Sequence, residues 1–174
     1  MALTQVQGGM ILPSTTLTTP IVSTTIGVGG ATPSSSGSGI TFPATQSSSS
    51  NVNTLDDYEE GTWTPAGVGQ TFASASGKYT KIGRVVYIQF DVIWSVNGAG
   101  NQAGMGGFPF PCDGSAYSFT RGTSTYSGSI VMTCPGYAGT TSGLLLYNFG
   151  NPGITDSAMS GLTLAGSGFY FAAT

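Results

Sequence analysis

Apolar and polar residues alternate most regularly between residues 85 and 96. The even positions of this stretch would place apolar side chains on one face of a strand, and the odd positions are mixed. This period of two predicts a β-strand with one face in a core. Gly83 before the stretch, and Asn97 with Gly98 after it, have the chemistry of turns. The predicted core positions are Val86, Ile88, Phe90, Val92, Trp94 and Val96.

Further runs of strand length follow, separated by clusters of Gly, Pro, Asn and Ser such as GAGNQAGMGG and NPGITDSAMSG. They predict strands over residues 116–121, 125–134, 143–149 and 162–171. Several short strands with frequent turns are typical of an antiparallel β-sandwich, here of a jelly-roll-like kind. No long helix is predicted, because only YEEG and DSAMSG could form a single helical turn.

The first 54 residues have a different character. They carry no charged side chain and consist largely of Thr, Ser, Gly and Pro with a few apolar residues. Such a composition is typical of a flexible linker. The alternative is an interwoven stalk, because one copy offers too few apolar side chains to offset the entropy lost on ordering, whereas several copies would bury them together. We therefore predict an extended arm over residues 1–54 and a β domain over residues 55–174.

Charge is scarce along the whole chain. Only 6% of residues are charged, against about a quarter in an average soluble domain, and the net charge is −3 with four basic residues. Nucleic-acid binding and basic amphipathic membrane helices both need several cations on one face, so neither is expected. No stretch is apolar over about 18 residues, so membrane insertion is not expected either. The N-terminus lacks the pattern of a signal peptide.

The residue types that common catalytic sites need are missing from the sequence. There is no histidine, so neither a Ser-His-Asp nor a Cys-His triad can be built. Two cysteines alone do not make a zinc site, and the glycine clusters do not lead into a helix with a lysine, as a phosphate loop would. We therefore expect no enzyme activity and no cofactor. Cys112 and Cys134 are interpreted as small buried thiols, with a disulfide left open.

Four of the seven acidic residues lie in one segment, TLDDYEEGTWTP, at residues 54–65. Such carboxylates could bind a hard cation or supply the two acids of a glycosidase. Neighbours on one strand or turn rarely face each other across a substrate cleft, however, so we favour a structural junction. In that interpretation the acids cap backbone amides or contact Lys78, Lys81 or Arg84 of this or a neighbouring subunit, and no catalytic or metal residue is assigned. The junction motif comprises Leu55, Asp56, Asp57, Tyr58, Glu59, Glu60, Gly61, Thr62 and Trp63.

This segment also resembles a recurring element of bacteriophage tail and head fibre proteins. LDDYEEGTWTP is preceded by GVGGATP and GITFPATQ and followed by GKYTKIGRVV, in the order and spacing of that family. Weaker matches are GFPFPCDGS, with Phe108 where a leucine is usual, and the closing GLTLAGSGFYFAAT. GVGGATP departs from the more common GIGT-like sequence. The resemblance covers approximately residues 26–174.

The resemblance implies a homotrimeric, non-catalytic fibre of the virion. Residues 1–54 would attach to another virion protein, and the β domain would lie outermost and bind a host-surface receptor, which in this family is often a glycan. The protein would be assembled in the host cytoplasm and exposed on the particle.

Two other functions stay open at this point. The chain could be a purely structural fibre that decorates the capsid or connects virion parts, or a glycan-degrading tail spike. A spike usually needs a longer β-helical body and paired carboxylates, and neither is visible. Receptor-binding residues are not assigned, because aromatic residues in strands usually pack in a core or interface. The candidates for an aromatic sugar platform are Tyr117, Phe119, Tyr126, Tyr137 and Tyr147.

Overall fold

The computed structural model describes residues 25–96, 100–113, 119–124, 130–133, 142–148 and 153–173. The chain divides into two compact units after Pro43. In the first unit, two short strands, β1 (Thr25–Gly27) and β2 (Gly39–Thr41), pair in parallel. The predicted boundary after residue 54 lies later than this division. Residues 44–54 belong to the second unit, where Gln46 and Ser49 donate hydrogen bonds to the Asp56 carboxylate.

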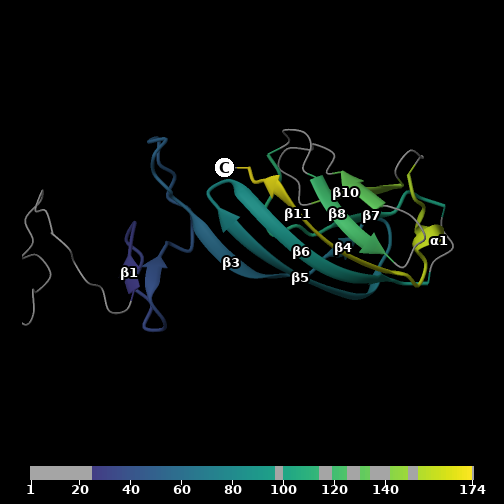
Figure 1. Ribbon diagram of the computed structural model, residues 1–174, viewed down its shortest axis with the longest axis horizontal. Coiled ribbons are helices and arrows are strands. Elements are labelled where there is room, and N and C mark those ends of the chain that lie inside the picture. The colour runs from purple at the N-terminus through teal and green to yellow at the C-terminus, as the bar shows by residue number, and fades with distance from the viewer. Residues whose placement is uncertain are drawn as a thin grey trace, which may run out of the picture. The chain divides into compact units, whose positions relative to one another are not determined.

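The described part of the second unit is all-β apart from one short helix, α1 (Asp156–Met159) (Figure 1). All pairings in its nine-stranded sheet are antiparallel, which confirms the predicted fold class at this level. The strands are β3 (Tyr58–Trp63), β4 (Ala66–Gly67), β5 (Phe72–Ile82), β6 (Val85–Trp94), β7 (Gly104–Gly106), β8 (Phe119–Ser124), β9 (Ile130–Thr133), β10 (Ser142–Asn148) and β11 (Thr163–Phe171).

The sequence predicted five of these strands at their approximate positions, namely β6 and β8 to β11. Val96 was assigned to the core wrongly: it lies beyond the end of β6 and is 91% exposed. The segment GAGNQAGMGG was interpreted as a loop, yet it contains β7. Two of the three residues of β7 are glycines, so no side-chain alternation marks this strand, although all three residues are buried. DSAMSG forms the predicted helical turn, with the Thr155 hydroxyl accepting a hydrogen bond from the Ala158 N–H at 3.3 Å.

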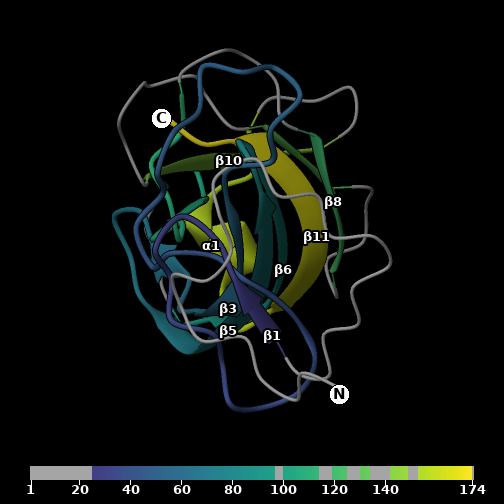
Figure 2. The same ribbon diagram turned by 90° about the vertical axis from the view of Figure 1, so that its left-hand side faces the viewer.

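The order of strands makes the sheet curl back on itself. The order is β3-β5-β6-β11-β8-β9-β10-β7-β4, so the two end strands, β3 and β4, follow each other directly in the chain. Only Thr64 and Pro65 separate them, and proline cannot donate a ladder hydrogen bond, which ends β3. The two edges of the sheet are therefore joined by two residues. Figure 2 shows β6 and β11 side by side, with β10 crossing near the top of the view.

The enclosed space is filled by the inward face of β6 and its neighbours. The five even positions of β6 from Val86 to Trp94 are all buried, while its odd positions are exposed. Leu164 and Tyr170 of β11 face the same core, as do Met105, Phe108 and Met159. The opposite face of β3, β5, β6 and β11 carries the exposed alternate residues. We call it the open face.

The helix α1 places a carboxylate inside this core. Asp156 is completely buried, and neither of its carboxylate oxygens has a hydrogen-bond partner among the described residues. Burial raises the pKa of Asp156 above its ordinary value of 3.8. Because the folded state then binds the proton more tightly than the unfolded state, this group lowers stability as the pH rises from 3.8 through the raised pKa.

We expect Asp156→Asn to raise the free energy of unfolding at pH 8 and to have little effect at pH 4, since the variant never carries the buried charge. Urea denaturation at both pH values measures this. Asp91→Asn, at an exposed position of β6, is the matched control and should leave the pH dependence unchanged. A wild-type chain that is more stable than Asp156→Asn at pH 8 would contradict the argument.

Candidate functional site on the open sheet face

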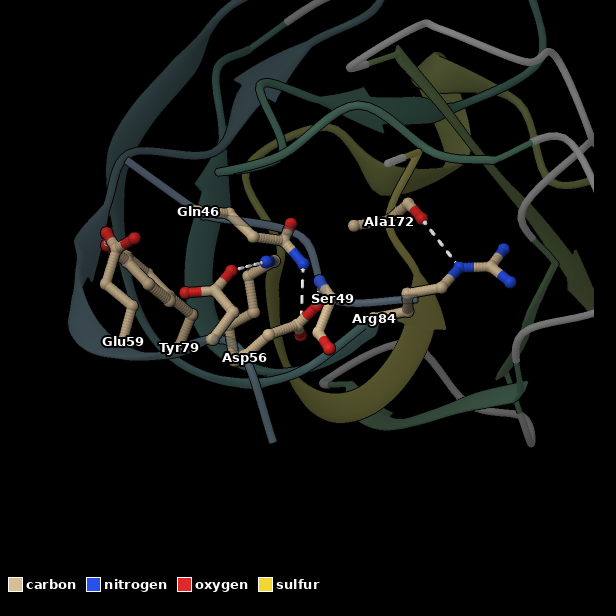
Figure 3. A network of polar contacts seen from close by, with 9 residues as sticks. Gln46, Ser49, Asp56, Glu59, Tyr79, Arg84 and Ala172 are labelled. Atoms are coloured by element: carbon tan, nitrogen blue, oxygen red, sulfur yellow. Dashed lines mark hydrogen bonds and ion pairs between the residues drawn. The ribbon is translucent and has the colours of Figure 1, made fainter. Parts of the chain in front are cut away.

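The junction motif forms β3 and the segment that leads into it. Leu55 is exposed. The Asp56 carboxylate accepts hydrogen bonds from the Ser49 N–H at 2.8 Å and the Gln46 side-chain amide at 3.3 Å (Figure 3). These bonds, with that from Ser49 contributing most, lower the pKa of Asp56. This first acid of the motif therefore fixes the preceding segment to the domain.

The second acid, Asp57, forms a buried ion pair with Lys81 of β5. The Lys81 ammonium also lies 5.2 Å from the centroid of the Phe110 ring, a distance suited to a cation–π contact. Burial lowers the pKa of Lys81, while the nearby Asp56 charge opposes that change. The backbone of Asp57 accepts a further hydrogen bond from the Gly83 N–H at 2.8 Å, next to the turn from β5 to β6.

The two glutamates of the motif are each engaged by a tyrosine hydroxyl. Tyr79 of β5 donates to Glu59, and Tyr58 donates to Glu60 within β3. Burial, together with the Glu59 carboxylate, raises the pKa of Tyr79 to about 12. Tyr79 therefore stays protonated at any physiological pH and remains a donor to Glu59.

The remaining residues of the motif form two glycine–aromatic pairs across β3 and β5. Gly61 lies opposite Tyr79, and Trp63 lies opposite Gly77. A Cβ added at Gly61 would lie 2.7 Å from the Tyr79 hydroxyl oxygen, and one at Gly77 would collide with the Trp63 indole. Each glycine thus leaves room for the ring on the other strand. The Trp63 indole N–H reaches the backbone oxygens of Lys78 and Gln89, both at 3.3 Å.

The motif therefore places its acids in contacts within the domain rather than in one cluster. Within the described ranges, no group of three or more His, Cys, Asp and Glu side chains is placed to hold a metal ion. None of the helices described is long and apolar enough to cross a bilayer. Thr62 of the motif is exposed on the open face, where it lines two hollows.

Two adjoining hollows lie on the open face over β3, β5 and β6. Their volumes are about 510 and 420 Å³. Thr62, Lys78 and Gln89, which are aligned across the three strands by the sheet register, border both hollows and separate them. The larger hollow is also lined by Trp63, Thr64, Ala75, Ser76, Gly77, Phe90 and Asp91, and the smaller one by Glu60, Gly61, Tyr79, Thr80 and Tyr87.

No family model, curated protein or solved structure matches this chain.

Unpaired charges gather at these hollows. Among the surface side chains that the structure describes, which do not include that of Arg121, Lys78 and Asp91 are the charged ones that make no hydrogen bond or ion pair. The other described surface charges are used within the fold, for example in the Arg84–Asp113 ion pair. The Gln89 side-chain amide has no partner either, and the Tyr87 ring is 51% exposed. These four side chains are available to a ligand.

Beside the hollows, toward the turn between β5 and β6, the open face becomes apolar. Tyr58, Ile82 and Val85 are adjacent across β3, β5 and β6, and Phe171 of β11 pairs with Val85. Phe169 packs edge to face on Phe171, with ring centroids 6.3 Å apart. All five side chains are exposed by 37% to 52%. We call them the apolar strip.

The five aromatic residues that the sequence suggested as sugar platforms cannot be compared with this face. Tyr117, Tyr126 and Tyr137 lie outside the described residues, as does Cys134, and Phe119 and Tyr147 lie in β8 and β10, of which the structure describes the backbone. Cys112 is buried in the core. Sequence reasoning did not single out Tyr87, Gln89 and Asp91. The sequence did contain a signal for them: these three residues alternate with buried apolar residues along β6, the most regular strand.

Proposed function

We propose that this chain is a non-catalytic phage virion fibre protein, whose β domain is displayed as a homotrimer for attachment to a host surface. The observation that carries the proposal is that two separate blocks of the resemblance, LDDYEEGTW and GKYTKIG, form the two strands β3 and β5 and contact each other. Asp57 meets Lys81, Glu59 meets Tyr79, and Trp63 covers Gly77. These two blocks, which are separate in the sequence, are thus one physical unit in the fold.

The surface of the second unit supports self-association. An apolar patch on an otherwise polar surface is typical of a protein–protein contact, and the apolar strip is such a patch. In our proposal, a second copy of the chain covers the strip in the trimer. The curled sheet would then act as a jelly-roll-like sandwich with the apolar strip turned to its neighbours.

The first unit suits the attachment arm. Among its described residues, Ile26 and Ile40 are about half exposed in a single copy. They would be buried when the arms of several copies come together or bind another virion protein. The functional location would accordingly be the virion.

The native mass of the full chain tests the assembly. We expect three times the monomer mass of 17.6 kDa, measured by light scattering or native mass spectrometry. We expect the double variant Val85→Glu with Phe171→Glu to sediment as a smaller species, because it would place charges in a buried contact. Ile93→Glu, at an exposed position of β6 outside the strip, is the control and should keep the wild-type mass. A monomeric wild-type protein would contradict the proposal.

Attachment is tested separately with the labelled full chain on a panel of bacterial strains. We expect binding to a subset of strains, since receptors vary in their chemistry between strains. A trimer that adsorbs to none of them would favour the structural fibre over the receptor-binding one.

A further inference from the structure

We propose that the two hollows over β3, β5 and β6 form one groove that binds an uncharged oligosaccharide. The proposal rests on the attachment function given above and assigns it to a place on the domain. The row Thr62–Lys78–Gln89 crosses the middle of this groove, between the two hollows, with Asp91 in the larger hollow and Tyr87 in the smaller one.

The shape of the groove follows from the register of three strands. Alternate residues point outward, so the side chains of neighbouring outward rows form the walls, and the backbone of the row between them forms the floor. The row Thr62–Lys78–Gln89 is flanked on one side by Ser76 and Asp91 and on the other by Thr80 and Tyr87. The two hollows together have the size of small-molecule sites, which are about 300–1,000 Å³.

The row in the middle of the groove is fixed from the inward side of the sheet. Trp63 lies on the inward side of the sheet, and its indole N–H reaches the backbone oxygens of Lys78 and Gln89, the two residues whose side chains border both hollows. Gly77 leaves the space that this ring occupies. Side chains on regular strands with a fixed floor are preorganised, which reduces the entropy lost when a ligand binds.

The lining suits a ligand with many hydroxyl groups. It offers hydroxyls from Thr62, Thr64, Ser76 and Thr80, an amide from Gln89, and both a cation and carboxylates. Hydroxyl groups donate and accept hydrogen bonds, so a sugar can use each of these partners. Tyr87 adds a half-exposed ring. Its apolar ring and polar hydroxyl suit a ligand such as a sugar, which presents both apolar C–H groups and hydroxyl groups.

Charge argues for an uncharged ligand. Lys78 and Asp91 line the same hollow with opposite charges, and Glu60 of the neighbouring hollow is already an acceptor for Tyr58. An acidic polymer would meet two carboxylates and one ammonium group, so the groove offers it no net attraction. A protein partner with an apolar surface would instead favour the apolar strip, which adjoins the smaller hollow where Phe169 pairs with Tyr87.

The test uses the full chain on an array of purified bacterial surface polysaccharides. The array includes uncharged glucans and galactans together with acidic polymers that contain uronate or sialate. We expect the wild-type protein to bind uncharged members. Tyr87→Ala and Gln89→Ala should each weaken that binding about tenfold, because each removes one anchoring contact. Ile93→Ala, the next outward position of β6 beyond Asp91 and outside both hollows, should stay within about twofold of wild type.

The outcomes separate this inference from the proposed function. Binding confined to acidic polymers, or to none, would overturn it. So would binding that Tyr87→Ala and Gln89→Ala leave unchanged, even where the trimer still adsorbs to cells, since attachment would then use another surface. If either variant changes the native mass, the groove is a contact between copies of the chain and the inference is wrong. A monomeric wild-type chain that binds uncharged glycans would support the binding groove and contradict the proposed trimer.

Discussion

Replacing Asp57 with asparagine should lower the free energy of unfolding by about 3–5 kcal/mol, the size found when one partner of a buried ion pair is removed. Asp57 and Lys81 are both buried, at 5% and 4% exposure, so the variant leaves the Lys81 ammonium without its countercharge. The Phe110 ring, 5.2 Å from that ammonium, compensates for only part of the loss. Urea denaturation at one fixed protein concentration measures the change, because the stability of an oligomer depends on concentration.

The second ion pair of the domain provides the matched control. Arg84 is half exposed where it meets Asp113, and exposed pairs contribute about 0–1 kcal/mol. Asp113→Asn should therefore have a small effect. The double variant Asp57→Leu with Lys81→Met should recover much of the lost stability, since a buried pair can often be replaced by apolar side chains of similar volume. Equal effects of Asp57→Asn and Asp113→Asn would show that the buried pair has no special role.

The second large effect is expected at Trp63. Trp63→Ala should lower the free energy of unfolding by about 3–5 kcal/mol, as for other buried aromatic residues, because Trp63 packs on Phe90 and Phe108 and covers Gly77. In the wild type, Gly77→Ala should also destabilise, by about 1–3 kcal/mol, since the added methyl group collides with a rigid ring.

The two substitutions should be strongly coupled. Once Trp63 is replaced by alanine, the space over Gly77 is open, and Gly77→Ala should become neutral or stabilising, because alanine loses less backbone entropy than glycine on folding. A double-mutant cycle measures this coupling. Gly83→Ala is not an equivalent control, because Gly83 has a positive φ of 55°. Additive effects of Trp63→Ala and Gly77→Ala would contradict the pairing of the ring with the glycine.

The sequence predicted those parts of the fold in which side chains alternate. Residues 85–96 revealed β6 because every second side chain is large and apolar. Strand β5 spans eleven residues, yet no strand was predicted there from the pattern of side chains. Its N-terminal half, FASAS, is built mainly from small side chains, which give little contrast between the two faces. Strand β7 was missed for a similar reason, since two of its three residues are glycines that contribute only backbone.

The candidate site was less accessible to such reasoning. A lysine in an alternating strand is normally assigned to solvent, so the burial of Lys81 depends on finding Asp57 on the neighbouring strand. The hollows depend on the alignment of Thr62, Lys78 and Gln89, which come from three strands and meet only in the correct register. Local sequence does not encode that alignment. The glycine–aromatic pairs fit the register of β3 against β5, and the pairing of β5 with β6 adds Gln89.

The position of β11 has a consequence for how the chain reaches this structure during synthesis. Formed by the last strand residues of the sequence, 163–171, it lies between β6 and β8 in the sheet order. Until it leaves the ribosome, β3, β5 and β6 can pair with one another, but they have no strand to join them to β8. A nascent chain therefore exposes one edge of β6 along its full length. Such an unpaired edge promotes association with other chains. We expect the sheet to be completed only after residues 163–171 have left the ribosome.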